Sequence, residues 1–366
     1  MTTKDSTNNS EKRKTHHIEF ARQAQTHTES LNRLFDYEPL CSGFPSENIV
    51  DLPRKIGKKQ VRFPLWISSM TGGTGKAGPI NKRLAKVAGE YGIGMGLGSC
   101  RPLLESDQYF DDFNLRPLIG EKGVLFANFG LAQIEQQIQK DAGKNLIKIC
   151  KKLDVDGVFI HVNPLQEWYQ PEGDRWFTSP LKVIERVSDI LHEADFLLGV
   201  KEVGQGMGPK SIESVLRGPC DILEFGAYGG TNFSLLELLR TPESLKNAGQ
   251  EDIGKRGTDL CYVGHTAGEM VYHVNRLNKE INDLGNSKTF IVSGGIRSFL
   301  EGYFLLENLE GNGLYAMAKP FLAAANEGES SLRQFVQSEL EGLTMAKAFL
   351  RAKPLDYQSM MQGRQI

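Results

Sequence analysis

Residues 158–167 read Val-Phe-Ile-His-Val-Asn-Pro-Leu-Gln-Glu, and the prediction of the fold starts from this stretch. A short apolar run ends in polar residues, and Pro164 then stops it. A continuous apolar run of this length is typical of a parallel strand that is buried on both faces. The polar residues therefore lie at the carboxyl end of a strand, where α/β proteins bind their ligands.

The same pattern recurs along the chain. The apolar runs lie at 65–70, 95–98, 124–128, 158–162, 197–203, 222–226, 290–293 and 314–318. Helical periodicity appears between them, for example at 80–91, 134–153, 181–193 and 267–284. Eight strand–helix units over about 290 residues predict an α/β fold of the TIM (β/α)8 barrel type rather than a doubly wound sheet.

The ends of the chain differ from the barrel region. We expect a flexible N-terminal tail and arm at 1–60, the barrel at 61–350 and a C-terminal tail at 351–366. Residues 1–11 are polar, which predicts a disordered tail. The amphipathic run at 18–34 is a candidate helix. No Gly/Ser-rich or Pro-rich linker follows the arm, so the sequence predicts one domain.

Composition excludes several classes of protein. The 366 residues include 43 basic and 45 acidic side chains, a net charge of −2, which gives no electrostatic footprint for nucleic acid. No run approaches the roughly 18 apolar residues of a membrane span. The N-terminus lacks the apolar core of a signal peptide, and the five scattered cysteines fit a reducing compartment. We therefore expect a cytoplasmic protein without a membrane or nucleic-acid partner.

Glycine-rich strings suggest where a phosphate binds. The strings at 92–98 and 204–208 lack the spacing and the following acid of a dinucleotide fingerprint, so a Rossmann site is not favoured. The string at 293–297 and the turn Ala318-Lys319 follow the last two strands, where barrels commonly build a phosphate site. The alternative interpretation is that these are two tight turns.

Lys201 lies at the end of the fifth predicted strand and is expected to point into the barrel mouth. A lysine in this position is suited to forming a Schiff base or to neutralising an anionic flavin ring. The alternative is a buried lysine that pairs with Glu202 or Glu224.

A polar cluster closes the fourth strand. Alternation places His161 and Asn163 on one face, and Gln166 and Glu167 follow on the loop. Mg²⁺ typically takes one or two carboxylates together with phosphate oxygens of the substrate, so Glu167 is a candidate ligand. A lone carboxylate is more often solvated, but four polar residues at one strand end are a stronger signal.

Taken together, these strings resemble the type 2 isopentenyl-diphosphate isomerase family, which consists of FMN-dependent TIM-barrel enzymes. The matching motifs occur in family order: Arg13-Lys14-x-x-His17-Ile18, Met70-Thr71-Gly72-Gly73, Gly98-Ser99-x-Arg101, Asn128, His161-x-Asn163-x-x-Gln166-Glu167, Pro171-Glu172-Gly173-Asp174-Arg175, Lys201-Glu202-Val203-Gly204-x-Gly206-Met207, Gly229-Gly230-Thr231-Asn232-Phe233 and Ser293-Gly294-Gly295. The joint pattern is highly specific, although single pieces are not.

The resemblance implies conversion of isopentenyl diphosphate to dimethylallyl diphosphate in isoprenoid biosynthesis, with reduced FMN, Mg²⁺ and NAD(P)H as the flavin reductant. It implies catalytic roles for Gln166, Lys201 and His161, and Mg²⁺ ligation by Glu167. The implied substrate-binding residues are Arg13, Lys14, His17, Arg101, His161, Asn163 and Gln166. The implied FMN-binding residues are Met70, Thr71, Gly72, Ser99, Asn128, Lys201, Thr231, Gly294, Gly295, Arg297, Ala318 and Lys319. A homo-oligomer, tetramer or octamer, is also implied.

The sequence departs from the family pattern at three places, and two other functions stay open. Cys100 stands where many members have Gln, Lys319 stands where many have Gly, and 258–269 lacks a common Trp-Gly string. One alternative is an FMN-dependent (β/α)8 oxidoreductase of the 2-hydroxy-acid oxidase or dihydroorotate dehydrogenase type. The other is a non-catalytic flavin-binding relative.

Overall fold

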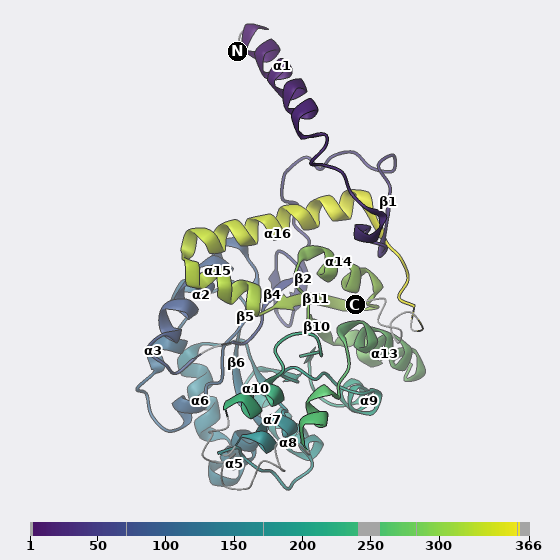
Figure 1. Cartoon of the computed structure of the whole chain (residues 1–366). Coiled ribbons are helices and arrows are strands. Elements are labelled where there is room, and N and C mark those ends of the chain that lie inside the picture. Colours follow the sequence, from purple (N-terminus) through teal and green to yellow (C-terminus); the bar gives the residue numbers. More distant parts are fainter. Residues whose placement is uncertain are drawn as a thin grey trace.

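The computed structural model describes residues 3–70, 72–170, 172–240, 257–282, 284–356 and 358. Its centre is a closed barrel of eight parallel strands in the order β10-β11-β4-β5-β6-β7-β8-β9 (Figure 1). The strands are β4 (Leu65–Ile67), β5 (Gly94–Gly96), β6 (Leu125–Gly130), β7 (Gly157–His161), β8 (Leu197–Lys201), β9 (Ile222–Glu224), β10 (Thr289–Ser293) and β11 (Asn312–Met317). Each overlaps one of the predicted apolar runs, so the predicted TIM barrel is confirmed.

Helices cover the outside of the barrel (Figure 1). The longer ones are α2 (Ala77–Tyr91), α5 (Leu131–Asp141), α6 (Lys144–Leu153), α8 (Pro180–Glu193), α9 (Pro209–Arg217), α13 (Ala267–Glu280), α14 (Phe299–Asn308), α15 (Lys319–Glu327) and α16 (Glu329–Phe349). The shorter ones are α3 (Phe110–Phe113), α4 (Arg116–Ile119), α7 (Pro164–Tyr169) and α10 (Phe233–Arg240). The helix predicted at 134–153 is two helices, because Ala142 and Gly143 take left-handed φ values of 56° and 77°.

Aromatic side chains fill the barrel below the strand ends. Trp66 makes edge-to-face contacts with Phe126 and Phe159, at ring-centroid distances of 5.7 and 6.0 Å. The hairpin of β2 (Arg54–Ile56) and β3 (Lys59–Val61) adds Ile56 and Val61 to this cluster. The amino-terminal end of the barrel is therefore closed by apolar packing, and chemistry is confined to the opposite end.

The N-terminal arm differs from its prediction in one respect. The helix expected at 18–34 is wrong, because α1 (Thr3–Phe20) lies earlier and includes part of the tail that was predicted to be disordered. Residues 3–20 contain no Gly or Pro, and within 21–34 the chain forms only one helical element, a short 3-10 helix at Thr28–Ser30. Figure 1 shows α1 projecting away from the barrel beyond α16.

The arm and the C-terminal segment meet in a short ladder. β1 (Phe35–Tyr37) pairs antiparallel with β12 (Leu350–Ala352), directly after α16. The division at residues 60 and 350 stays a prediction, since β3 and β12 lie across these two positions. No helix in the described ranges combines the length and hydropathy that a membrane crossing requires.

Candidate active site at the carboxyl ends of the strands

Three polar side chains lie side by side at the carboxyl ends of neighbouring strands. His161 of β7 is in register with Lys201 of β8, and Lys201 is in register with Glu224 of β9. Lys201 is 6% exposed and Glu224 is 1% exposed. A row of buried ionisable groups at the barrel mouth is costly unless a ligand uses it, so this row is the centre of the candidate site.

His161 is neutral at neutral pH. Burial, followed by the nearby charge of Lys201, lowers the pKa of His161 to about 3. Its Nδ1 lies 3.0 Å from Oδ1 of Asn128, which is a predicted FMN ligand. An amide oxygen only accepts, so Nδ1 carries the hydrogen and Nε2 is left as an acceptor.

Lys201 does not form the ion pair with Glu202 or Glu224 that was the alternative prediction from the sequence. Its Nζ donates to the backbone carbonyl of Glu202 at 2.9 Å. Within the described residues it forms no ion pair with Glu202 or Glu224, although its charge partly opposes the burial that raises the pKa of Glu202. The Glu202 carboxylate accepts backbone N–H groups instead, and Oε1 of Glu224 accepts from the Ser68 hydroxyl at 2.7 Å. The lysine charge thus remains available to an anionic ligand.

The loop after β7 forms a network around Asn163, which is 3% exposed. Its Nδ2 donates to Oε1 of Gln166 at 3.0 Å and to Oε1 of Glu167 at 3.1 Å. Oε2 of Glu167 accepts from the backbone N–H of Asp174 at 2.7 Å. The predicted cluster is therefore brought together, and its amides are fixed by one another.

Two acidic residues of this network were not assigned roles from the sequence. Glu237 in α10 is 3% exposed and accepts from Nε2 of Gln166 at 3.2 Å. Asp174 accepts from Arg101 at 2.8 Å and from Gln133 at 2.5 Å. The only local signal for Glu237 is a carboxylate within the apolar helix Phe-Ser-Leu-Leu-Glu-Leu-Leu-Arg.

Two glycine loops form a cradle suited to a phosphate. A Cβ on Gly294 would lie 2.1 Å from the carbonyl oxygen of Ala227, and its φ is +99°, so only glycine fits there. Gly294 directly follows the last residue of the β10–β11 ladder, and among the described residues the backbone N–H of Gly295 has no hydrogen-bond acceptor. The nearby helix α15 begins at Lys319 with no side-chain cap. A free N–H group beside a helix N-terminus matches the chemistry of a phosphate oxygen.

The remaining predicted cofactor residues are found as follows. Met70 and Gly72 lie after β4, Ser99 and Thr231 are exposed loop residues, and Lys319 is exposed. Thr71 lies outside the described residues. Arg297 is held by Glu301 at 2.6 Å, so its charge is already paired. The roles of these residues stay predictions.

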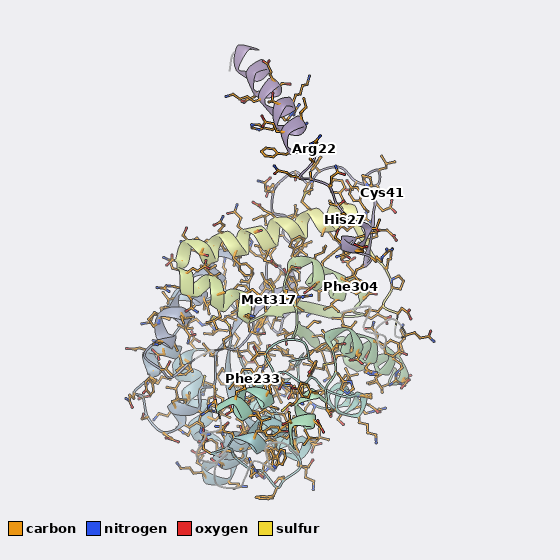
Figure 2. All side chains as sticks on the ribbon, viewed as in Figure 1. Arg22, His27, Cys41, Phe233, Phe304 and Met317 are labelled. Atoms are coloured by element: carbon orange, nitrogen blue, oxygen red, sulfur yellow. The ribbon has the colours of Figure 1, made fainter. Side chains whose placement is uncertain are left out.

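Three predicted substrate residues are not brought to the barrel mouth by this single chain. Arg13, Lys14 and His17 lie on the exposed helix α1. Figure 2 shows Arg22, just after α1, far from Phe233, which begins α10, with α16 between them in this view. Their predicted contact with a diphosphate therefore requires either a rearrangement of the arm or a neighbouring copy of the chain.

Cys100 does not face the mouth. Its side chain is fully buried in the hydrophobic core, its N–H donates to the carbonyl of Asn128 at 2.7 Å, and burial raises the pKa of its thiol to about 12.

In the region from 240 to 269, residues 241–256 lie outside the described part.

No group of three metal-binding side chains is present among the described residues. Glu167 is the one carboxylate predicted to bind Mg²⁺, and both of its oxygens accept hydrogen bonds from other groups of the chain. A single carboxylate suits Mg²⁺ only where phosphate oxygens and water supply the other ligands.

A cavity of about 550 Å³ lies on the outer side of β8, away from the row of polar strand ends. It is bounded by α8, α9 and the segments before them, and Val200 and Glu202 form part of its wall. Val200 and Lys201 point to opposite faces of β8, so this cavity is separate from the barrel mouth.

Known proteins resemble this chain in sequence and in fold. It is 32% identical over 291 residues to an isopentenyl-diphosphate delta-isomerase of Rickettsia peacockii, covering 78% of this chain and 77% of that protein. It is 30% identical over 346 residues to one of Nostoc sp., covering 94% and 92%. No family model matches the chain.

Solved structures support the fold alone. A flavocytochrome b2 mutant with benzoylformate has a TM-score of 0.57 at 13% identity, covering 90% of this chain and 80% of that one. A mandelate oxidase mutant with an FMN adduct has a TM-score of 0.53 at 13% identity, covering 87% and 88%.

The closed parallel barrel, with its buried polar groups at the carboxyl ends of the strands, defines a TIM-barrel enzyme. The identities to curated relatives decide between such enzymes. The chain belongs to the isopentenyl-diphosphate delta-isomerase family. The predicted family and enzyme class are confirmed.

Proposed function

We propose that the chain converts isopentenyl diphosphate to dimethylallyl diphosphate, a step of isoprenoid biosynthesis, with reduced FMN and Mg²⁺ as cofactors. The observation that carries the proposal is the row formed by His161, Lys201 and Glu224, with an unneutralised lysine at its centre. Family membership supplies the reaction, and this row supplies a place for an anionic cofactor beside the glycine cradle.

FMN fits the residues that are present. The N–H groups of Gly294 and Gly295 and the N-terminus of α15 would hold its phosphate, and Lys201 would lie against its ring. The buried indole N–H of Trp66 and the Ser69 hydroxyl, for which the described part of the chain offers no hydrogen-bond partner, lie below the same mouth. Reduced FMN, when bound, supplies a proton donor and acceptor for an alkene carbon and is not consumed.

The protein residues would position the substrate for these proton transfers. An alkene is a very weak base, so its protonation needs a well-placed acid in a pocket that excludes water. Asn163 and Glu237 hold the Gln166 amide from both sides. We propose that this amide either orients the reacting carbons of the substrate or relays the second proton. His161 offers Nε2 as a hydrogen-bond acceptor.

The diphosphate would bind at the rim of the same mouth. Arg101, held by Asp174, stands near the Asn163 network, and charge-assisted contacts to a diphosphate are strong. Glu167 would ligate Mg²⁺ together with diphosphate oxygens. Arg13, Lys14 and His17 would complete the site from the arm of a neighbouring copy, which agrees with the proposed tetramer or octamer.

NAD(P)H would serve only to reduce FMN, and we propose a cytoplasmic location. The resemblance to type 2 isomerases supports the reductant, since the reaction itself is redox-neutral. The five scattered, free cysteines support the location, since they suit a reducing compartment.

An anaerobic assay tests the proposal. Protein, FMN, dithionite, Mg²⁺ and isopentenyl diphosphate are combined in D₂O, and the product is followed by NMR. We expect dimethylallyl diphosphate that contains deuterium, and none when the flavin is oxidised. Gln166→Ala should abolish turnover, whereas Gln337→Ala on the exposed face of α16 should not. FMN bound without product would favour a redox enzyme or a flavin-binding relative instead.

A further inference from the structure

The segment 202–206, directly after Lys201, is shaped by one buried carboxylate. Oε2 of Glu202 accepts the backbone N–H groups of Gly204, Gln205 and Gly206 at 2.7, 2.6 and 3.1 Å. Three N–H groups on a single oxygen fold the segment into a tight turn. The turn therefore fixes the course of the chain immediately after the strand that carries Lys201.

The side chain of Gln205 connects this turn to two other segments. Its Oε1 accepts from the Ser234 hydroxyl at 2.7 Å, and its Nε2 donates to the carbonyls of Leu260 and Val263 at 3.1 and 2.6 Å. Its own carbonyl accepts from the N–H of His265 at 2.8 Å. The side chain is 8% exposed, so any rotation of the amide leaves buried groups without partners.

The outer side of the turn borders a cavity. Gln205, Gly206 and Met207 line the cavity of about 550 Å³ between α8 and α9. Met207 packs in the hydrophobic core, so the turn is held by this packing and by the hydrogen bonds of Glu202 and Gln205, while its other side borders the cavity.

The connection continues to the candidate active site. Ser234 lies in the first turn of α10, and Glu237 lies one turn later. Glu237 accepts the hydrogen bond of Gln166 at 3.2 Å. Gln205 therefore stands between Lys201, four residues before it in the chain, and the helix that fixes Gln166.

We infer that Gln205 is a positioning residue, which holds α10 and the strand end of Lys201 in the relative arrangement that catalysis needs. The inference rests on the proposed function, because that function assigns the roles of Lys201 and Gln166. Position 205 is the unspecified residue in the motif Lys201-Glu202-Val203-Gly204-x-Gly206-Met207, so the family motif assigns it nothing.

The first test replaces Gln205 by methionine, which is unbranched, similar in length and unable to form the three side-chain hydrogen bonds. In the FMN-loaded protein we expect kcat to fall about tenfold or more, with KM for isopentenyl diphosphate changed by less than about threefold, because misplacement costs turnover before it costs binding. The matched control is Asn275→Leu, which removes an amide bridge to Asn308 and Glu310 at the other end of the barrel.

Both variants should lose thermal stability, but only Gln205→Met should lose kcat. An equal effect of the two variants on kcat would overturn the inference. Ser234→Ala is a milder second variant that removes only the hydroxyl donor. If the residues act as one unit, the double variant should be no slower than Gln205→Met alone. Additive losses would contradict the connection through Ser234.

Hydrogen–deuterium exchange separates this inference from the proposed function. In Gln205→Met we expect faster exchange in α10 and in 257–265 than in Asn275→Leu, whether or not the protein isomerises the substrate. Faster exchange in a protein without isomerase activity would support the coupling and reject the proposed function. Unchanged exchange in α10 would overturn the coupling itself.

Discussion

Nε2 of Gln166 donates a hydrogen bond to the buried carboxylate of Glu237 at 3.2 Å, although 71 positions separate the two residues in the sequence. Oε1 of the same amide accepts from Asn163 at 3.0 Å. The two contacts decide which end of the amide is the donor and which is the acceptor. The orientation of Gln166 in the site is thus imposed by α10.

Removing the charge of Glu237 should slow turnover without releasing the cofactor. In Glu237→Gln the new amide can offer a donor to Gln166, which allows the Gln166 amide to rotate, so we expect kcat to fall by about tenfold to a hundredfold. The Kd of FMN should not change, as measured by flavin fluorescence. The matched control is Glu172→Gln, which removes the exposed carboxylate that also pairs with Arg240. Equal activities of the two variants would contradict this role.

Lys201 should set the reduction potential of bound FMN. A cation beside the ring favours the anionic reduced form, so Lys201→Met should make the potential more negative, by about 30 mV for each tenfold change in relative affinity. A titration with redox dyes measures this shift. Lys288→Met is the control, because Lys288 is equally buried but donates to the carbonyls of Gly218 and Cys220 near the amino-terminal end of β10. A similar shift in both variants would reject a specific effect.

Gly294→Ala should abolish FMN binding. The new Cβ would lie 2.1 Å from the carbonyl oxygen of Ala227, and the φ of +99° is unfavourable for alanine, so the loop has to move away from the cradle. Gly43→Ala is the control, since no atom lies within 4 Å of its Cβ position. Equilibrium dialysis with FMN measures both. Normal FMN affinity in Gly294→Ala would remove this loop from the cofactor site.

Glu339 should make the protein less stable as pH rises. Burial raises the pKa of this carboxyl from about 4.5 to about 7, and its nearest phenol is Tyr315, 3.5 Å away. The folded protein keeps the proton until about pH 7, whereas the unfolded chain loses it near pH 4.5. The contribution is therefore fully present below pH 4.5 and is lost between these two values, up to about 3 kcal/mol.

Glu339→Gln should remove this dependence and raise stability at pH 8 by about 1–3 kcal/mol relative to the native chain. Denaturant unfolding at pH 5 and pH 8 measures it. The control is Glu341→Gln on the same helix, where the exposed Glu341 accepts a hydrogen bond from Gln337. This variant should keep the pH dependence of the native chain. An unchanged difference between the two pH values in Glu339→Gln would contradict the assignment.

The barrel and most of its strand-end residues could be predicted from the sequence. The apolar run of β7 and the residues His161, Asn163 and Gln166 after it are local patterns, because side-chain alternation and the stop at Pro164 involve only neighbours in the chain. Parallel strands then place their carboxyl ends on one side of any such barrel. Local sequence patterns are therefore enough to predict the fold and most of the members of the candidate site.

How those members are held depends on contacts that form only in the folded chain. The contact of Gln166 with Glu237 and the hydrogen bond of Glu224 with Ser68 join segments that are distant in the chain. The projection of α1 away from the barrel is likewise seen only in the folded chain (Figure 1). Such contacts form when the barrel closes and brings different loops together, and no local pattern of residues records which groups then meet.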